Sequence, residues 1–161
     1  MHEGITRVAV LGTGTIGASW AAFFLSRGLH VAASDPAPHA EGFLRHFIDQ
    51  AWPTLDRLGL HPGADPAALT FHADPAAAAD GAGFVQENGP ERIDVKVELF
   101  ERISQALPAD ALIASSSSTL VPTAMQARCR HPERLVLGHP FNPPHLIPLV
   151  EVAGGGQTSP E

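Results

Sequence analysis

One stretch near the N-terminus decides the fold, and it reads Val8-Ala-Val-Leu-Gly12-Thr-Gly14-Thr-Ile-Gly17-Ala-Ser-Trp-Ala-Ala-Phe-Phe-Leu25. A continuous apolar run predicts a buried strand over 7–11, and apolar residues at helical spacing predict a helix over 15–26. Between them the glycines follow the pattern G-x-G-x-x-G. Gly12 permits a tight turn, Gly14 lets a pyrophosphate approach the backbone, and Gly17 allows the helix to pack closely on the strand.

The strand before this loop and the helix after it favour a dinucleotide-binding loop over an ordinary glycine-rich turn. A helix N-terminus offers free N–H groups and a positive dipole end to phosphates, so we expect Thr15 and Ile16 to join the three glycines in binding the cofactor. A second predicted strand, over 30–34, leads into Asp35, 23 positions after Gly12. That is near the spacing of an acidic residue that binds the adenosine ribose. The predicted cofactor is NAD, because the 2′-phosphate of NADP would meet the charge of Asp35.

The rest of the chain alternates predicted strands and helices. Further strands are predicted over 69–73, 83–87, 111–115, 134–139 and 148–153, and helices over 39–58, from 75, over 93–107 and after 122. Pro53 is expected to kink or interrupt the second helix. The alternation predicts an α/β fold: a Rossmann-type, doubly wound, mostly parallel sheet with helices on both faces. We predict an NAD-binding domain over 1–153, followed by a linker or tail over 154–161.

Composition excludes several classes of protein. The chain has 161 residues, of which 44% are hydrophobic, enough for one domain with a buried core. A net charge of −7 argues against a nucleic-acid partner, and no basic amphipathic run or long apolar segment indicates a membrane partner. The single cysteine, Cys129, and the absence of a leader pattern at the start favour a cytoplasmic location. We predict no metal site.

Polar residues follow three of the predicted strands, over 86–91, 115–119 and 139–144. In a doubly wound sheet, ligands bind at the carboxyl ends of the strands. His139 stands at such an end, and an imidazole suits the proton transfer that accompanies hydride transfer from an alcohol. Other interpretations remain open: the chain has nine histidines, the serine run over 115–118 could be an ordinary loop, and Glu151 could lie on the solvent face of an edge strand.

With these residues in view, the chain resembles the N-terminal, NAD-binding domain of the 3-hydroxyacyl-CoA dehydrogenase family. The resemblance covers the whole chain and is most specific over 84–92 and over 138–143 leading to 148–152. It implies that His139 is the general acid/base, that Glu151 hydrogen-bonds the imidazole and favours its charged form, and that Ser118 binds the substrate oxygen. In the family the serine precedes the histidine by 21 positions and the glutamate follows it by 12, which this chain matches.

The resemblance also implies contacts with the cofactor. Asn142 is expected near the nicotinamide end, and Glu91 and Lys96 match positions that contact the cofactor ribose or the substrate. Family members continue into a helical C-terminal domain that builds much of the substrate pocket and the dimer interface. That domain lies outside this sequence, so a homodimer is expected only in its presence.

The implied activity is that of an NAD-dependent oxidoreductase acting on a small 3-hydroxy acid. Within the family the similarity is greatest to the branch that oxidises L-carnitine to 3-dehydrocarnitine. A 3-hydroxyacyl-CoA and L-gulonate are the alternative substrates. From a different class, the chain could be an NAD-binding module with no turnover of its own.

Overall fold

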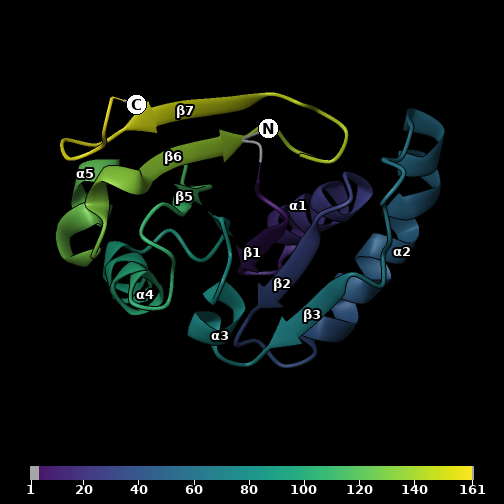
Figure 1. The fold of residues 1–161 in the computed structure, drawn as a ribbon, viewed down its shortest axis with the longest axis horizontal. Helices are drawn as coiled ribbons and strands as arrows, with labels where there is room; N and C mark the ends of the chain where they lie inside the picture. The colour runs from purple at the N-terminus through teal and green to yellow at the C-terminus, as the bar shows by residue number, and fades with distance from the viewer. Residues whose placement is uncertain (1–3, 161) are drawn as a thin grey trace.

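The computed structural model describes residues 4–160, which form a seven-stranded sheet in the order β3-β2-β1-β4-β5-β6-β7 (Figure 1). All pairs are parallel except the last, in which β7 runs antiparallel to β6. The reversal of strand order between β1 and β4 is the switch point at which such sheets bind dinucleotides. The strands are β1 (Arg7–Leu11), β2 (His30–Ser34), β3 (Leu69–His72), β4 (Phe84–Glu87), β5 (Leu112–Ser115), β6 (Leu135–Pro140) and β7 (Val150–Gly154).

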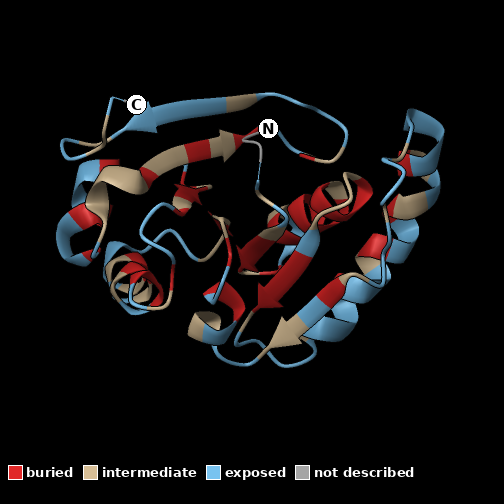
Figure 2. Ribbon diagram, viewed as in Figure 1, coloured by how far each residue is buried: buried red, intermediate tan, exposed pale blue. Residues whose placement is uncertain are grey.

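Helices cover both faces of the sheet and create two separate cores. On one face lie α1 (Thr15–Ser26) and α2 (Ala40–Leu58), and on the other lie α3 (Pro75–Ala79), α4 (Ile93–Ser104) and α5 (Pro122–Met125). Two 3-10 turns, Gln126–Arg128 and Pro132–Arg134, lead into β6. Figure 2 shows the buried residues concentrated in the central strands and the inward sides of the helices. The predicted fold class is therefore confirmed.

The sequence of β1 explains why both faces are covered. Val8 and Val10 point into the core under α1, whereas Ala9 and Leu11 point into the core under α3 and α4. Successive side chains of a strand alternate between faces, so a strand buried on both sides must be apolar throughout. This pattern makes β1 recognisable from the sequence.

The second helix is continuous, so one of the two effects expected of Pro53, an interruption, is absent. Pro53 does not interrupt α2, which runs without a break from Ala40 to Leu58. Pro53 lies on the exposed side, while Ala51 and Leu55 stay buried against the core. Proline removes one backbone hydrogen bond, and the burial of the neighbouring turns maintains the helix around it.

The C-terminal residues also differ from the expected linker or tail. Gly154 belongs to β7, and the following residues hydrogen-bond Thr123 in α5 and Leu135 in β6. Thr158 Oγ1 donates to the carbonyl of Leu135 at 2.8 Å and accepts from Gln126 Nε2 at 2.9 Å. Gln126 is 1% exposed, so this segment satisfies a buried amide group that the glycine run did not reveal. Among residues 4–160, no helix is long and apolar enough to cross a membrane.

Candidate active site

The glycine loop joins β1 to α1, and two of its glycines are required by packing. Gly12 takes φ +83°, and a Cβ there would lie 2.8 Å from backbone atoms of Asn88. A Cβ on Gly17 would lie 1.8 Å from the carbonyl oxygen of Gly12. Neither position could carry a side chain without moving the backbone, so both are needed to form the loop.

Gly14 has a different environment. A Cβ there would meet nothing within 4 Å among the described residues, so packing within the chain does not require this glycine. Gly14 is the N-cap of α1, and no described side chain caps the helix there. The first N–H groups of a helix lack partners within the helix and can bind phosphate oxygens. The loop, with Thr15 and Ile16 in the first turn of α1, therefore fits a pyrophosphate.

Asp35 stands at the end of β2, beside this loop. Its Oδ2 accepts hydrogen bonds from the backbone N–H and the hydroxyl of Thr13, at 2.7 and 3.3 Å, and its Oδ1 accepts from the N–H of Ala37 at 2.8 Å. These bonds fix the carboxylate at the wall of a cavity of about 240 Å³, which Gly14 and Phe43 also line. The position suits a carboxylate that binds the hydroxyls of the adenosine ribose.

His139 and Glu151 are brought together by the antiparallel pairing of β6 and β7. The register places the two residues directly opposite each other, and side chains in such a pair lie on the same face. His139 Nδ1 lies 3.1 Å from Glu151 Oε2. The imidazole is 33% exposed and the carboxylate 65% exposed, so a ligand can reach the pair. Glu151 is on the edge strand, but it is not simply a solvent-facing residue.

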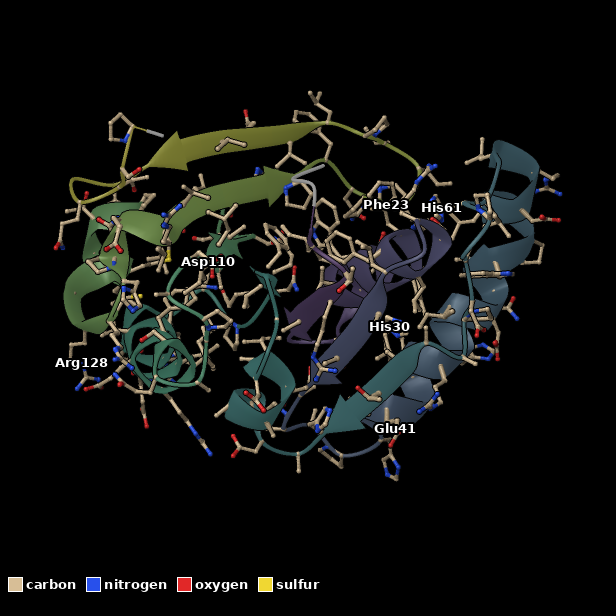
Figure 3. All side chains as sticks on the ribbon, in the orientation of Figure 1. Phe23, His30, Glu41, His61, Asp110 and Arg128 are labelled. Atoms are coloured by element: carbon tan, nitrogen blue, oxygen red, sulfur yellow. The ribbon has the colours of Figure 1, made fainter. Side chains whose placement is uncertain are left out.

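Two other described histidines, His30 and His61, are labelled in Figure 3 and are placed differently. His30 begins β2, at the opposite end of the strand from Asp35. His61 lies in the loop that follows α2, where its Nδ1 accepts from the N–H of Gly63. His139 combines a position near the carboxyl end of its strand with a carboxylate partner, an arrangement that suits proton transfer.

Ser118 lies in the loop after β5 and is held by Glu91. Glu91 Oε1 accepts from the backbone N–H and the hydroxyl of Ser118, at 2.6 and 3.0 Å, and from Ser117 Oγ at 3.0 Å. Partial burial acts to raise the pKa of Glu91, but the hydrogen bonds from Ser117 and Ser118 and the charge of Lys96 outweigh it. The pKa therefore lies below its ordinary value. Glu91 is an anion that shapes the serine loop, and Ser118 itself is exposed.

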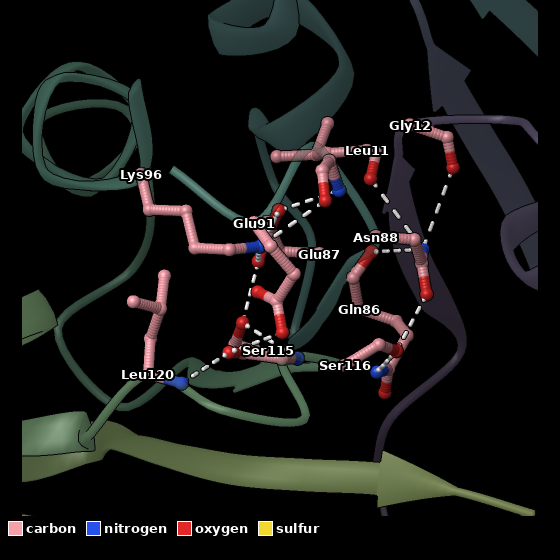
Figure 4. A network of polar contacts seen from close by, with 12 residues as sticks. Leu11, Gly12, Gln86, Glu87, Asn88, Glu91, Lys96, Ser115, Ser116 and Leu120 are labelled. Carbon is pink, nitrogen blue, oxygen red and sulfur yellow. Dashed lines mark hydrogen bonds and ion pairs between the residues drawn. The ribbon is translucent and has the colours of Figure 1, made fainter. Parts of the chain in front are cut away.

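Lys96 forms an ion pair with Glu87, whereas the resemblance implies a contact with the cofactor ribose or the substrate. Its ammonium lies 2.7 Å from both carboxylate oxygens of Glu87, and the two side chains are 1% and 0% exposed (Figure 4). Ser115 Oγ and the N–H of Gly89 donate to the same carboxylate. A buried carboxylate requires a cation and hydrogen bonds, so Lys96 compensates Glu87 and does not present its ammonium to a ligand.

A second polar network, which the sequence did not predict, links the glycine loop to β6 (Figure 4). Asn88 Nδ2 lies 3.4 Å from the carbonyl of Leu11 and 3.5 Å from that of Gly12. Ser116 Oγ donates to Asn88 Oδ1 at 2.7 Å, and Gln86 Nε2 donates to Ser116 Oγ at 2.8 Å. Gln86 Nε2 also approaches the carbonyl of the residue before His139, at 3.4 Å. Only the position of these polar residues at strand ends could have signalled the network.

Asn142 follows β6 and is exposed, at the start of the loop that leads to β7. The candidate site therefore consists of the glycine loop, Asp35, the serine loop, the His139–Glu151 pair and Asn142. Within residues 4–160, no cluster of three or more histidine, cysteine or acidic side chains is placed to hold a metal ion.

Comparisons with known proteins agree with this geometry. Residues 7–161 match the sequence profile of the family described as 3-hydroxyacyl-CoA dehydrogenase, NAD binding domain. The L-carnitine dehydrogenase of Burkholderia mallei is 52% identical over 157 residues, which are 98% of this chain and 49% of that protein. The L-carnitine dehydrogenase of Pseudomonas putida is 49% identical over the same share of each chain. The chain thus spans about half the length of these relatives.

Solved structures show the same fold. The 3-hydroxybutyryl-CoA dehydrogenase of Escherichia coli superimposes with a TM-score of 0.87 at 30% identity, over 98% of this chain and 34% of that one. A 5-formyl-3-hydroxy-2-methylpyridine 4-carboxylic acid 5-dehydrogenase, described as an NAD⁺-dependent dismutase, gives a TM-score of 0.88 at 37% identity, over 97% of this chain and 51% of that one. With its glycine loop, its strand order and the family match over nearly its full length, the chain belongs to the 3-hydroxyacyl-CoA dehydrogenase family, as its NAD-binding domain.

Proposed function

We propose that this chain is the cofactor-binding part of an NAD-dependent dehydrogenase that oxidises the 3-hydroxyl group of L-carnitine. The observation that carries the proposal is the His139–Glu151 hydrogen bond in the sheet that also carries the glycine loop. The choice of L-carnitine is supported by the two L-carnitine dehydrogenases that are 52% and 49% identical to this chain. A 3-hydroxyacyl-CoA is the second candidate substrate, supported by the structural likeness to a 3-hydroxybutyryl-CoA dehydrogenase.

The side chains then take the following roles. Glu151 accepts a hydrogen bond from the Nδ1–H of His139, which leaves Nε2 as the base that takes the proton of the 3-hydroxyl group. The carboxylate also stabilises the imidazolium that forms. Ser118, whose hydroxyl donates to Glu91 in this structure, turns that hydroxyl to donate to the substrate oxygen when the substrate binds. Asn142 contacts the nicotinamide end of the cofactor. NAD, when bound, supplies the acceptor for the hydride from C3.

The remaining parts of the proposal concern the whole protein. The cofactor domain includes β7 and the segment that packs behind it. The rest of the substrate pocket and the dimer interface are built by the helical domain that the family resemblance implies. The proposal also places the protein in the cytoplasm.

The test is a rate measurement on the full-length protein, following the absorbance of the reduced cofactor. We expect a higher kcat/KM for L-carnitine than for 3-hydroxybutyryl-CoA or L-gulonate. We also expect kcat/KM to be about tenfold or more higher with NAD than with NADP. The reason is that the 2′-phosphate of NADP would place a second negative charge near Asp35, at a cost of about 1–4 kcal/mol. Asp35→Ser should narrow that gap.

Two results would contradict this account. If kcat/KM is higher for 3-hydroxybutyryl-CoA than for L-carnitine, the assignment of L-carnitine as the substrate is wrong. Equal use of NAD and NADP by the unmodified protein would remove the role assigned to Asp35.

A further inference from the structure

The loop over 141–149, which connects β6 to β7, is exposed along most of its length. Its first and last residues are joined by a hydrogen bond from the N–H of Phe141 to the carbonyl of Leu149, at 3.0 Å. Between these ends, Asn142 and 146–148 are exposed, whereas Pro144 is buried and His145 is partly buried. In Figure 1 the loop extends away from the strands toward α1. The loop is therefore anchored near its middle.

The anchor is a pair of contacts between His145 and Ser19 in α1. Ser19 Oγ accepts from the backbone N–H of His145 at 3.0 Å and lies 2.7 Å from its Nδ1. Ser19 is 0% exposed, and the ring of Phe47 in α2 packs edge-on against the imidazole at a centroid distance of 5.6 Å. Burial lowers the pKa of His145, which favours the neutral ring. In a neutral ring, Nδ1 can accept a hydrogen bond from the hydroxyl of Ser19. The same hydroxyl oxygen accepts from the backbone N–H of His145, so one hydroxyl group makes both hydrogen bonds.

The two residues connect the two ends of the proposed cofactor site. Ser19 lies in the helix whose N-terminus is capped by Gly14. His145 lies three residues after Asn142, in the loop whose flanking strands carry His139 and Glu151. We propose that Ser19 and His145 form a positioning clasp that holds the 141–149 loop at the distance from the glycine loop that the nicotinamide end of bound NAD requires.

This inference rests on the proposed function, since it assumes that NAD spans from Gly14 to Asn142. Ser19 and His145 touch neither substrate nor cofactor; they act through the loop. A purely structural anchor would affect the binding of every part of the cofactor equally, or stability alone. A positioning clasp affects the nicotinamide end selectively, because the adenosine and pyrophosphate groups contact the glycine loop and Asp35, which lie outside the 141–149 loop.

The experiment compares NAD with ADP-ribose, which lacks the nicotinamide ring, as ligands of the full-length protein in calorimetric titrations. For His145→Ala and Ser19→Ala we expect the Kd of NAD to rise about tenfold and kcat to fall by a similar or larger factor, because small displacements of reacting groups are costly. The Kd of ADP-ribose should stay nearly unchanged. His145→Asn should recover most of the loss, since its amide oxygen can accept from Ser19.

His131→Ala is the matched control, because His131 pairs with Glu133 in the turn before β6, in a segment that does not include the 141–149 loop. Equal weakening of NAD and ADP-ribose in the Ser19 and His145 variants would overturn the clasp and leave a structural anchor. Unchanged NAD binding and kcat would also overturn it. If the unmodified protein binds ADP-ribose and NAD with the same affinity, the clasp fails while the cofactor site survives; if it binds neither, the proposed function fails as well.

Discussion

Replacing His139 with alanine in the full-length protein is expected to lower kcat for the oxidation of L-carnitine by about a hundredfold or more, which is the usual contribution of a positioned general base. The Kd of NAD should remain nearly unchanged, because the groups assigned to the adenosine and pyrophosphate are those of the glycine loop and Asp35, not the imidazole of His139. Steady-state kinetics measure kcat, and a calorimetric titration of NAD on the same preparation measures the Kd.

Glu151→Gln should lower kcat by a smaller factor than His139→Ala. The amide oxygen of glutamine can still accept from Nδ1–H, but it carries no charge to stabilise the imidazolium. His131 and Glu133 offer a matched control, since their side chains lie 3.3 Å apart and are also partly exposed. Glu133→Gln should leave kcat unchanged. A His139→Ala variant that retains its kcat would remove the catalytic assignment and leave only the cofactor site.

The second large effect concerns stability. Lys96→Met is expected to lower the free energy of unfolding by about 3–5 kcal/mol, because it leaves the carboxylate of Glu87 buried without its cation. The double variant Lys96→Met, Glu87→Gln should recover much of this loss, since it removes the uncompensated charge. Chemical denaturation followed by circular dichroism measures all three proteins.

An exposed ion pair provides the comparison for this prediction. Arg45 and Glu41 lie 2.8 Å apart in α2, with 48% and 47% of their side chains exposed. Arg45→Met should therefore change the free energy of unfolding by less than about 1 kcal/mol. If Lys96→Met costs no more than Arg45→Met, the buried pair does not have the structural role described above.

The parts of the fold that depend on local sequence could be predicted. The apolar run of β1, the glycines and the apolar residues of α1 lie within twenty residues, and together they favour a dinucleotide-binding loop over an ordinary glycine-rich turn. The contact between His139 and Glu151 was also expected, because the spacing in the family that the chain resembles selects both residues.

Contacts between distant segments could not be predicted in the same way. Ser19 and His145 are 126 residues apart, and neither residue type signals a partner. Lys96 was assigned to a ligand because it matches a family position that contacts the cofactor ribose or the substrate, and only the three-dimensional position of Glu87 explains its burial. The C-terminal segment was assigned to a linker because of its glycines, whereas the buried Gln126 determines where it packs.

The measurement that tests the cofactor site most directly is the Kd of NAD for Gly14→Ala, together with its free energy of unfolding. A Cβ at Gly14 would meet nothing within 4 Å among the described residues, and φ is −62°, so stability should change by less than about 1 kcal/mol. The Kd of NAD should nevertheless rise about tenfold or more, because the methyl group would displace the pyrophosphate from backbone N–H groups. A stable Gly14→Ala variant that binds NAD as tightly as the unmodified protein would contradict the placement of the cofactor on this loop.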